Sequence, residues 1–84
     1  PGEAWRAVED GRIALGGSIP VNASGGWMGV GHPVGATGVR MLIDAMRQTT
    51  ANAGDYQVEG AKSVATINVG GTGTTNCSFV VGTA

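Results

Sequence analysis

The sequence contains one cysteine and one histidine among its 84 residues. One cysteine cannot form an internal disulfide, and a lone Cys/His pair is a poor ligand set for a structural metal. Charged residues make up only 13% of the chain and the net charge is −1, so no basic surface indicates nucleic acid or an anionic membrane as a partner. No apolar run approaches the ~20 residues that span a bilayer, and no signal peptide is recognisable. These absences favour a reduced, cytoplasmic setting without a nucleic-acid or membrane partner.

Glycine, in contrast, is abundant, with 16 residues. Each glycine loses more backbone freedom on folding than another residue would, and a chain of this length buries only about 60–65% of the surface that its unfolded form exposes. The chain also begins at Pro1 and not at a methionine. We therefore interpret it as a piece of a larger protein.

The first third of the chain predicts little regular structure. Residues 3–9 have the composition of a short helix that turns inward Ala4, Val8 and Trp5. Residues 12–21 are interrupted by glycine and proline, which favours a loop with at most a short strand. Residues 22–33 contain four glycines, so we expect an irregular segment.

The firmest prediction is a helix over residues 35–50. An apolar stripe follows the i, i+3, i+4, i+7 spacing and is expected to face the core, with Arg40 and Asp44 on the opposite face; the stripe consists of Val39, Leu42, Ile43 and Met46. The β-branched pair Thr49-Thr50 is expected to end the helix. Arginine and lysine side chains elsewhere are scattered, which is typical of solvated positions.

Two strands are expected at residues 63–69 and 74–81, because both runs are rich in Val, Thr, Ile and Phe. Gly70-Gly71-Thr72-Gly73 separates them and is short enough for a hairpin. Both runs are almost continuously apolar or small, so the sheet, of three strands at most, is expected to be covered on both faces.

His32 lies between Gly31 and Pro33, immediately before the predicted helix. Histidine titrates nearest to physiological pH, Gly31 allows a ligand to approach the backbone, and a helix start favours negative charge. These features suit a site that handles charge on oxygen. A structural hydrogen bond from His32, a tight turn at 35–38 or a weak phosphate-binding loop without the usual lysine remain open alternatives on the residues alone.

Residues 22–38, N-A-S-G-G-W-M-G-V-G-H-P-V-G-A-T-G, resemble the Gly-His-Pro block of the thiolases. The resemblance covers essentially the whole chain, yet only about the last fifth of a thiolase subunit. It implies an α/β fold, the C-terminal part of a thiolase fold in which a loop, a helix and a β-hairpin belong to a larger α-β-α layered sheet. Residues 1–84 would then form a partial thiolase C-terminal domain, with a lead-in helix and Gly-His-Pro loop at 1–34, a helix at 35–50 and a hairpin at 63–81.

The same resemblance implies roles for individual residues. His32 matches the family histidine that activates the nucleophilic cysteine and holds the thioester oxygen. Gly70 matches the glycine whose N–H helps to form an oxyanion hole, and Gly31 and Gly71 lie on the substrate side of these two loops. Removing one such oxyanion donor typically costs roughly 3–4 kcal/mol of transition-state stabilisation.

Many thiolases have an acid/base cysteine at the position of Asn68. An asparagine there resembles the sterol carrier protein type of thiolase. An amide can hold a hydrogen bond but cannot carry a proton in the useful pH range. Cys77 is expected to pack in the core and not to replace that cysteine. Trp27 would either line an acyl pocket or pack under the loop, and packing is favoured.

The resemblance therefore implies part of an acyl-CoA C-acyltransferase that makes or cleaves β-ketoacyl-CoA. The coenzyme A thioester would be a substrate, with no further cofactor and no metal. Partners would be the remainder of the subunit and further copies in a homodimer or homotetramer. Alternatives are a non-catalytic or truncated thiolase-like subunit, a thiolase-like retro-aldolase acting on CoA esters and, more weakly, a nucleotide-binding piece.

Overall fold

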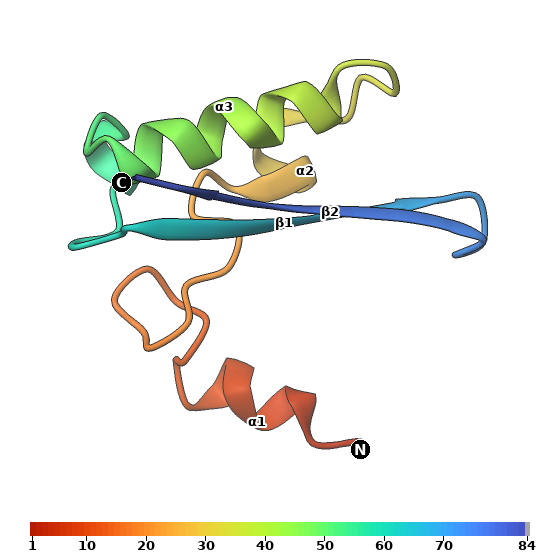
Figure 1. Cartoon of the computed structure of the whole chain (residues 1–84). Helices are drawn as coiled ribbons and strands as arrows, with labels where there is room; N and C mark the ends of the chain where they lie inside the picture. The colour runs from red at the N-terminus through yellow and green to blue at the C-terminus, as the bar shows by residue number, and fades with distance from the viewer. Residues whose placement is uncertain (84) are drawn as a thin grey trace. The chain divides into compact units, whose positions relative to one another are not determined.

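The computed structural model describes residues 1–83 and divides into two compact units, the first from Pro1 to Gly31 and the second from His32 onward. The first unit contains α1 (Ala4–Glu9) and α2 (Gly26–Val30). The second contains α3 (Thr37–Thr49), the short 3-10 helix η1 (Gly54–Tyr56), and strands β1 (Ser63–Gly70) and β2 (Thr75–Gly82) (Figure 1). Helices combined with an antiparallel sheet confirm the predicted α/β class.

The helix expected at the start of the chain is present as α1, but its burial was predicted wrongly. Trp5 and Val8 are mostly exposed, and Ala7 is the half-buried residue of the helix. The Arg6 guanidinium lies 5.4 Å from the centre of the Trp5 ring, a cation–π contact that covers part of the indole. Six residues are too few to make an isolated helix stable, so α1 depends on its neighbours in the chain.

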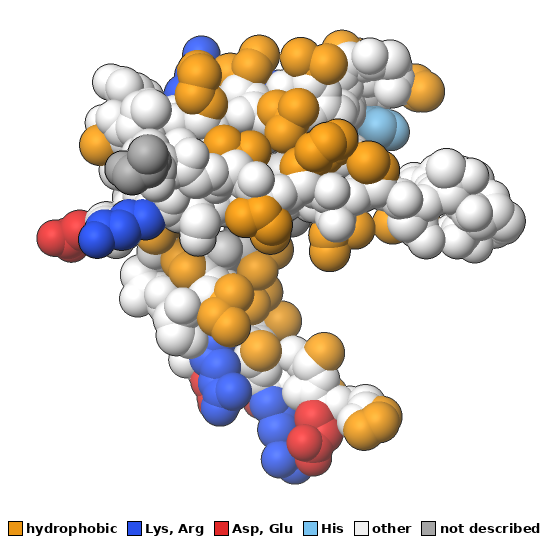
Figure 2. All heavy atoms as spheres, viewed as in Figure 1, with side chains coloured by type: hydrophobic (Ala, Val, Ile, Leu, Met, Phe, Trp, Pro, Cys, Tyr) orange, Lys and Arg blue, Asp and Glu red, His pale blue; other side chains and the backbone are white. Residues whose placement is uncertain are grey.

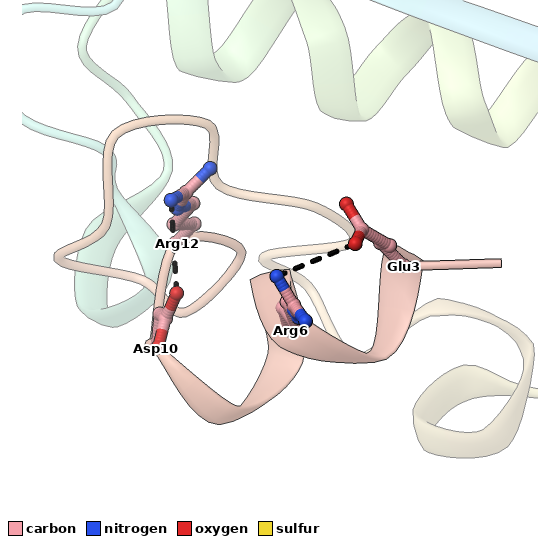
Figure 3. A network of polar contacts seen from close by, with 4 residues as sticks. All are labelled: Glu3, Arg6, Asp10 and Arg12. Carbon is pink, nitrogen blue, oxygen red and sulfur yellow. Dashed lines mark ion pairs between the residues drawn. The ribbon is translucent and has the colours of Figure 1, made fainter. Parts of the chain in front are cut away.

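Two ion pairs accompany α1 (Figure 3). Arg6 lies 3.3 Å from Glu3, and Arg12 lies 3.6 Å from Asp10. Because all four side chains are well exposed, water screens both pairs and each adds less than about 1 kcal/mol to stability.

The prediction that residues 22–33 are irregular throughout is wrong, because Gly26–Val30 form the one-turn helix α2. Its beginning needs glycine: Gly25 and Gly26 have φ angles of 100° and 59°, which side chains on L-residues disfavour. Residues 12–21 form a loop without a strand, as expected. The glycine-rich composition therefore did not indicate this helix, although glycine is needed where the helix begins.

α3 ends in a Schellman arrangement immediately after the predicted Thr49-Thr50 pair. The N–H of Asn52 donates to the carbonyl of Arg47 at 2.8 Å, and the N–H of Ala51 donates to that of Gln48 at 3.3 Å. Ala51 occupies the left-handed position, with φ 58°, that glycine usually takes. The Thr50 hydroxyl adds a 2.8 Å hydrogen bond to the Met46 carbonyl, so several carbonyls of the last turn are satisfied.

The apolar stripe of α3, expected to face a core, does not face the hairpin within the described residues. Val39, Ile43 and Met46 are exposed, and Leu42 is half-buried. The buried residues of the helix are Thr37, Ala45 and Gln48, flanked by the half-buried Arg40, Met41 and Asp44. α3 therefore buries small or hydrogen-bonded side chains against the hairpin, and its apolar side chains lie on the outward side. Figure 2 shows hydrophobic side chains spread over the surface of the molecule.

The hairpin agrees with the sequence prediction. β1 and β2 pair antiparallel in a register that runs from Ser63 opposite Gly82 to Gly70 opposite Thr75. The turn uses Gly71 and Gly73 at φ 58° and 90°, and the N–H of Gly73 donates to the Gly70 carbonyl at 3.1 Å. The sheet contains these two strands within the described residues.

α3 lies along one face of this hairpin (Figure 1). Along β1 the residues that face α3 are less exposed than their neighbours: Val64, Thr66, Asn68 and Gly70. Ile67 and Val69 point to the opposite face and are 68% and 59% exposed. Within the described residues α3 covers one face of the sheet; cover of the other face by sequence outside this chain stays a prediction.

Two glutamines fasten the C-terminal end of α3 to the segment that leads into β1. The Gln48 amide donates to the Tyr56 carbonyl at 2.7 Å, and its oxygen accepts from the N–H of Val58 at 2.8 Å. The Gln57 amide donates to the Gln48 carbonyl at 3.0 Å. We call Gln48 and Gln57 the glutamine clip. Beside it, a hydrogen bond to the Tyr56 phenol raises the pKa of the exposed Arg47 guanidinium.

Candidate functional site

His32 begins the second unit and is exposed. The residue before it, Gly31, ends α2 with φ 82° and ψ 176°, a conformation that essentially only glycine adopts. A Cβ added at Gly31 would meet no atom within 4 Å, so its glycine is explained by backbone conformation and not by crowding. The chain therefore needs glycine here to direct its single histidine out of α2.

Thr37, the first residue of α3, holds the His32 ring. The distance from His32 Nδ1 to Thr37 Oγ1 is 2.7 Å. The same hydroxyl donates to the carbonyl of Pro33 at 3.1 Å, one helical turn back. Thr37 is only 2% exposed, so solvent does not compete for its hydroxyl. The imidazole is thus fixed to the start of the helix by a short, sequence-local contact.

Asn68 lies at the same end of α3. It is half-buried on the face of β1 that packs against the helix, and a Cβ added at Gly38 would lie 3.8 Å from the Asn68 side-chain oxygen. Gly38 follows Thr37 directly, so the structure brings the predicted amide close to the residue that holds His32. A small residue at 38 keeps this approach open.

Gly70 and Gly71 lie where β1 passes into the turn. A Cβ at Gly70 would lie 3.0 Å from the backbone oxygen of Thr75, so the paired strand leaves little room for a side chain there. Gly71 has φ 58°. Gly70 is thus two residues beyond Asn68 along the same strand, and its oxyanion role stays a prediction.

Cys77 is not a core residue, contrary to the sequence prediction. Its thiol is free and exposed, and in the strand register it lies directly opposite Asn68. Residues opposite each other on antiparallel strands project to the same face. The expectation of burial was wrong because β2, unlike β1, is exposed along nearly its whole length.

Trp27 belongs to α2 in the first unit and is 54% exposed. The favoured interpretation, packing under the loop, stays a prediction. Its place in an acyl pocket stays a prediction, as does the substrate role of Gly31.

Among residues 1–83, no group of three or more His, Cys, Asp or Glu side chains could hold a metal ion. No helix in this part of the chain is long and apolar enough to cross a membrane. The polar side chains that the structure brings together at this end of α3 are the His32 imidazole, the Thr37 hydroxyl and the Asn68 amide.

Comparison with known proteins shows the family of the chain. Residues 1–83 match the family model described as thiolase C-terminal domain-like. The chain belongs to the thiolase family. Its relatives in the family include an acetyl-CoA acetyltransferase of Methanothermobacter thermautotrophicus, 50% identical over 74 residues, which are 88% of this chain and 19% of that protein.

Two further relatives have different names. Sterol carrier protein 2 of Bos taurus is 38% identical over 69 residues, which are 82% of this chain and 13% of that protein. The benzoylsuccinyl-CoA thiolase subunit BbsB of Thauera aromatica is 35% identical over 72 residues, 86% of this chain and 19% of that protein. The chain thus spans a fifth or less of the length of these curated relatives.

Sequence reasoning singled out His32 and Asn68 but missed Thr37. The signal was available, since Thr37 is the T of the G-A-T-G segment and lies four residues after Pro33. A threonine hydroxyl in a helix commonly donates to the carbonyl four residues earlier. What the sequence alone could not supply was the fold of the loop that returns His32 to that hydroxyl.

Proposed function

We propose that this chain is the C-terminal portion of an acyl-CoA C-acyltransferase of the thiolase family, which makes or cleaves β-ketoacyl-CoA. Its share of the active site is His32, as the group that activates a nucleophilic cysteine supplied by other sequence, and the Gly70 N–H as an oxyanion-hole donor. The coenzyme A thioester is the substrate, and the reaction needs no further cofactor. The observation that carries the proposal is the 2.7 Å contact that fixes His32 at the start of α3, beside the strand that contains Asn68.

The chemistry explains why such a constellation is suitable. Attack of a thiolate on a thioester, and attack of an α-carbanion equivalent on the acyl-enzyme, both place negative charge on a carbonyl oxygen. The partial positive charge at the beginning of α3 favours such an oxygen nearby. An imidazole can both take the proton of the thiol and donate to the oxygen.

The remainder of the subunit is the first partner in this proposal, and its support is the exposed apolar side of α3. A helix that is packed on one side and apolar on the other is typical of helices covered on both sides. The proposal extends to a homodimer or homotetramer in the cytoplasm, which light scattering of the full-length protein tests. The 84-residue chain alone is expected to be inactive, because in this proposal the nucleophilic cysteine comes from other sequence.

The test is a His32→Ala substitution in the full-length protein, assayed for thiolysis and for condensation of acyl-CoA. We expect turnover to fall 10²–10⁴-fold, the usual contribution of a positioned acid/base group. Val34→Ala is the matched control, since Val34 lies in the same loop and is almost fully exposed. Near-normal turnover in His32→Ala would end the proposal.

A second candidate is favoured by Asn68, whose amide cannot carry a proton. The full-length protein would then be a non-catalytic thiolase-like subunit, or a retro-aldolase acting on CoA esters. Aldol cleavage of a β-hydroxyacyl-CoA ester without thiolysis would identify the retro-aldolase. Absence of all three activities, with co-elution of a partner chain, would identify the non-catalytic subunit.

A further inference from the structure

We propose that Thr37 is a positioning residue that holds neutral His32 as the Nδ1–H tautomer, so that Nε2 is the nitrogen that accepts a proton. The inference deepens the proposed function and rests on it for its catalytic consequence. For the tautomer it rests on the two contacts of the Thr37 hydroxyl.

The direction of the hydrogen bonds follows from a count of protons. A threonine hydroxyl has one proton, and here it is donated to the Pro33 carbonyl at 3.1 Å. With its proton on the Pro33 carbonyl, the same oxygen accepts toward His32, which assigns a proton to Nδ1 across the 2.7 Å contact. The reverse assignment, with the hydroxyl donating to Nδ1, would leave Thr37 Oγ1 against the Pro33 oxygen with no proton between them.

The acceptor is held rigidly, which is what allows it to select a tautomer. Thr37 is the first residue of α3, is 2% exposed, and its β-branched side chain has few rotamers in a helix. Pro33 accepts from the backbone N–H groups of Ala36 and Thr37 as well, at 2.9 and 3.0 Å. In the other tautomer the hydroxyl proton would turn from the Pro33 carbonyl to Nδ1, which would leave the two oxygens 3.1 Å apart without a proton between them.

The consequence for the reaction is direct. Nε2 takes the proton of the nucleophilic thiol, which leaves a thiolate and an imidazolium. The Nδ1–H bond to Thr37 is retained through this step and becomes charge-assisted, hence stronger. The proton now on Nε2 can be donated to the thioester oxygen or returned to sulfur. With the proton fixed on Nδ1, Nε2 can first accept the thiol proton and then donate it. In the other tautomer Nε2 already has a proton and could not accept the one from the thiol.

The experiment uses the full-length protein with ¹⁵N-labelled histidine. Long-range ¹H–¹⁵N spectra distinguish the two tautomers, and the His32 signals are identified by their loss in His32→Gln. We expect Nδ1–H in the wild type and in Thr37→Ser, which keeps the hydroxyl, and a shift toward Nε2–H in Thr37→Val, which removes it at nearly constant volume. An Nε2–H signal in the wild type would overturn the proposal without any variant being needed.

Kinetics supply the second readout. Loss of one selecting hydrogen bond is expected to lower kcat about tenfold in Thr37→Val, with KM little changed, and Thr37→Ser should restore most of the rate. A purely structural threonine would not move the tautomer, so an unchanged tautomer and kcat in a folded Thr37→Val protein contradict the positioning role. If His32→Ala is fully active while the wild type is Nδ1–H, the proposed function fails and the tautomer assignment stands. The converse result, an inactive His32→Ala protein with an Nε2–H wild type, rejects only the inference.

Discussion

Replacing Gln48 with methionine should open the segment between α3 and β1 without disturbing the site. Gln48 is 7% exposed, and its side chain donates to the Tyr56 carbonyl and accepts from the Val58 N–H. A methionine side chain has a similar length but makes neither hydrogen bond. Each such bond contributes about 1 kcal/mol net, so the local opening free energy should fall by about 2 kcal/mol. That difference corresponds to a roughly 30-fold rise in the opening equilibrium constant.

Native-state hydrogen exchange at the Val58 amide measures this effect directly, since that N–H is one of the two groups that lose their partner. Gln57→Met removes other bonds of the glutamine clip and should give an effect of similar size. The double variant should lose less than the sum, because both side chains close the same segment. Met46→Ala, on the exposed side of the helix, is the control. Protection at Val58 that stays within about twofold of the wild type in Gln48→Met would refute this account of the clip.

Three further predictions concern single positions. Gly31→Ala should destabilise the protein by about 2 kcal/mol in denaturant titration, since alanine is strained at φ 82°, ψ 176°; an unchanged midpoint would contradict the backbone argument. Ala51→Gly should stabilise it by about 1 kcal/mol, because glycine relieves the left-handed residue at the end of α3; a lower melting temperature would count against that relief. The Cys77 thiol should react with a maleimide in the native chain nearly as fast as in urea, and strong native protection would show that it is covered.

The elements of the second unit could be predicted because their signals are local. β-branched residues at Thr49-Thr50 and a glycine-rich turn between two β-prone runs mark boundaries wherever the chain folds. α2 could not be predicted, since five residues with two glycines have no helical period to detect. Its formation depends on the positive φ angles at Gly25 and Gly26, which composition equally allows in an irregular loop.

Which side of α3 packs against the hairpin could not be predicted, for a different physical reason. An apolar stripe shows which side of a helix water disfavours, but not which side the nearest strands cover. Here the covered side contains Thr37 and Gln48, whose polar groups are satisfied by Pro33 and by the glutamine clip. These partners come within hydrogen-bond distance only in the folded chain. The burial of Thr37 and Gln48 could therefore not be predicted from the pattern of the helix.

The contacts that hold His32 are local in the sequence, and this explains how the site depends on the fold. His32, Pro33 and Thr37 lie within six consecutive residues, so their contacts form as soon as the first turn of α3 does. A helix of 13 residues is marginal alone, and its packing against the hairpin therefore decides whether the imidazole is held at all. Gln48 lies eleven residues beyond Thr37, about 16 Å along the helix at 1.5 Å per residue. Opening the clip should consequently expose the Val58 amide while leaving the His32 ring signals unchanged, and a tautomer shift in Gln48→Met would show that the two ends of α3 are coupled.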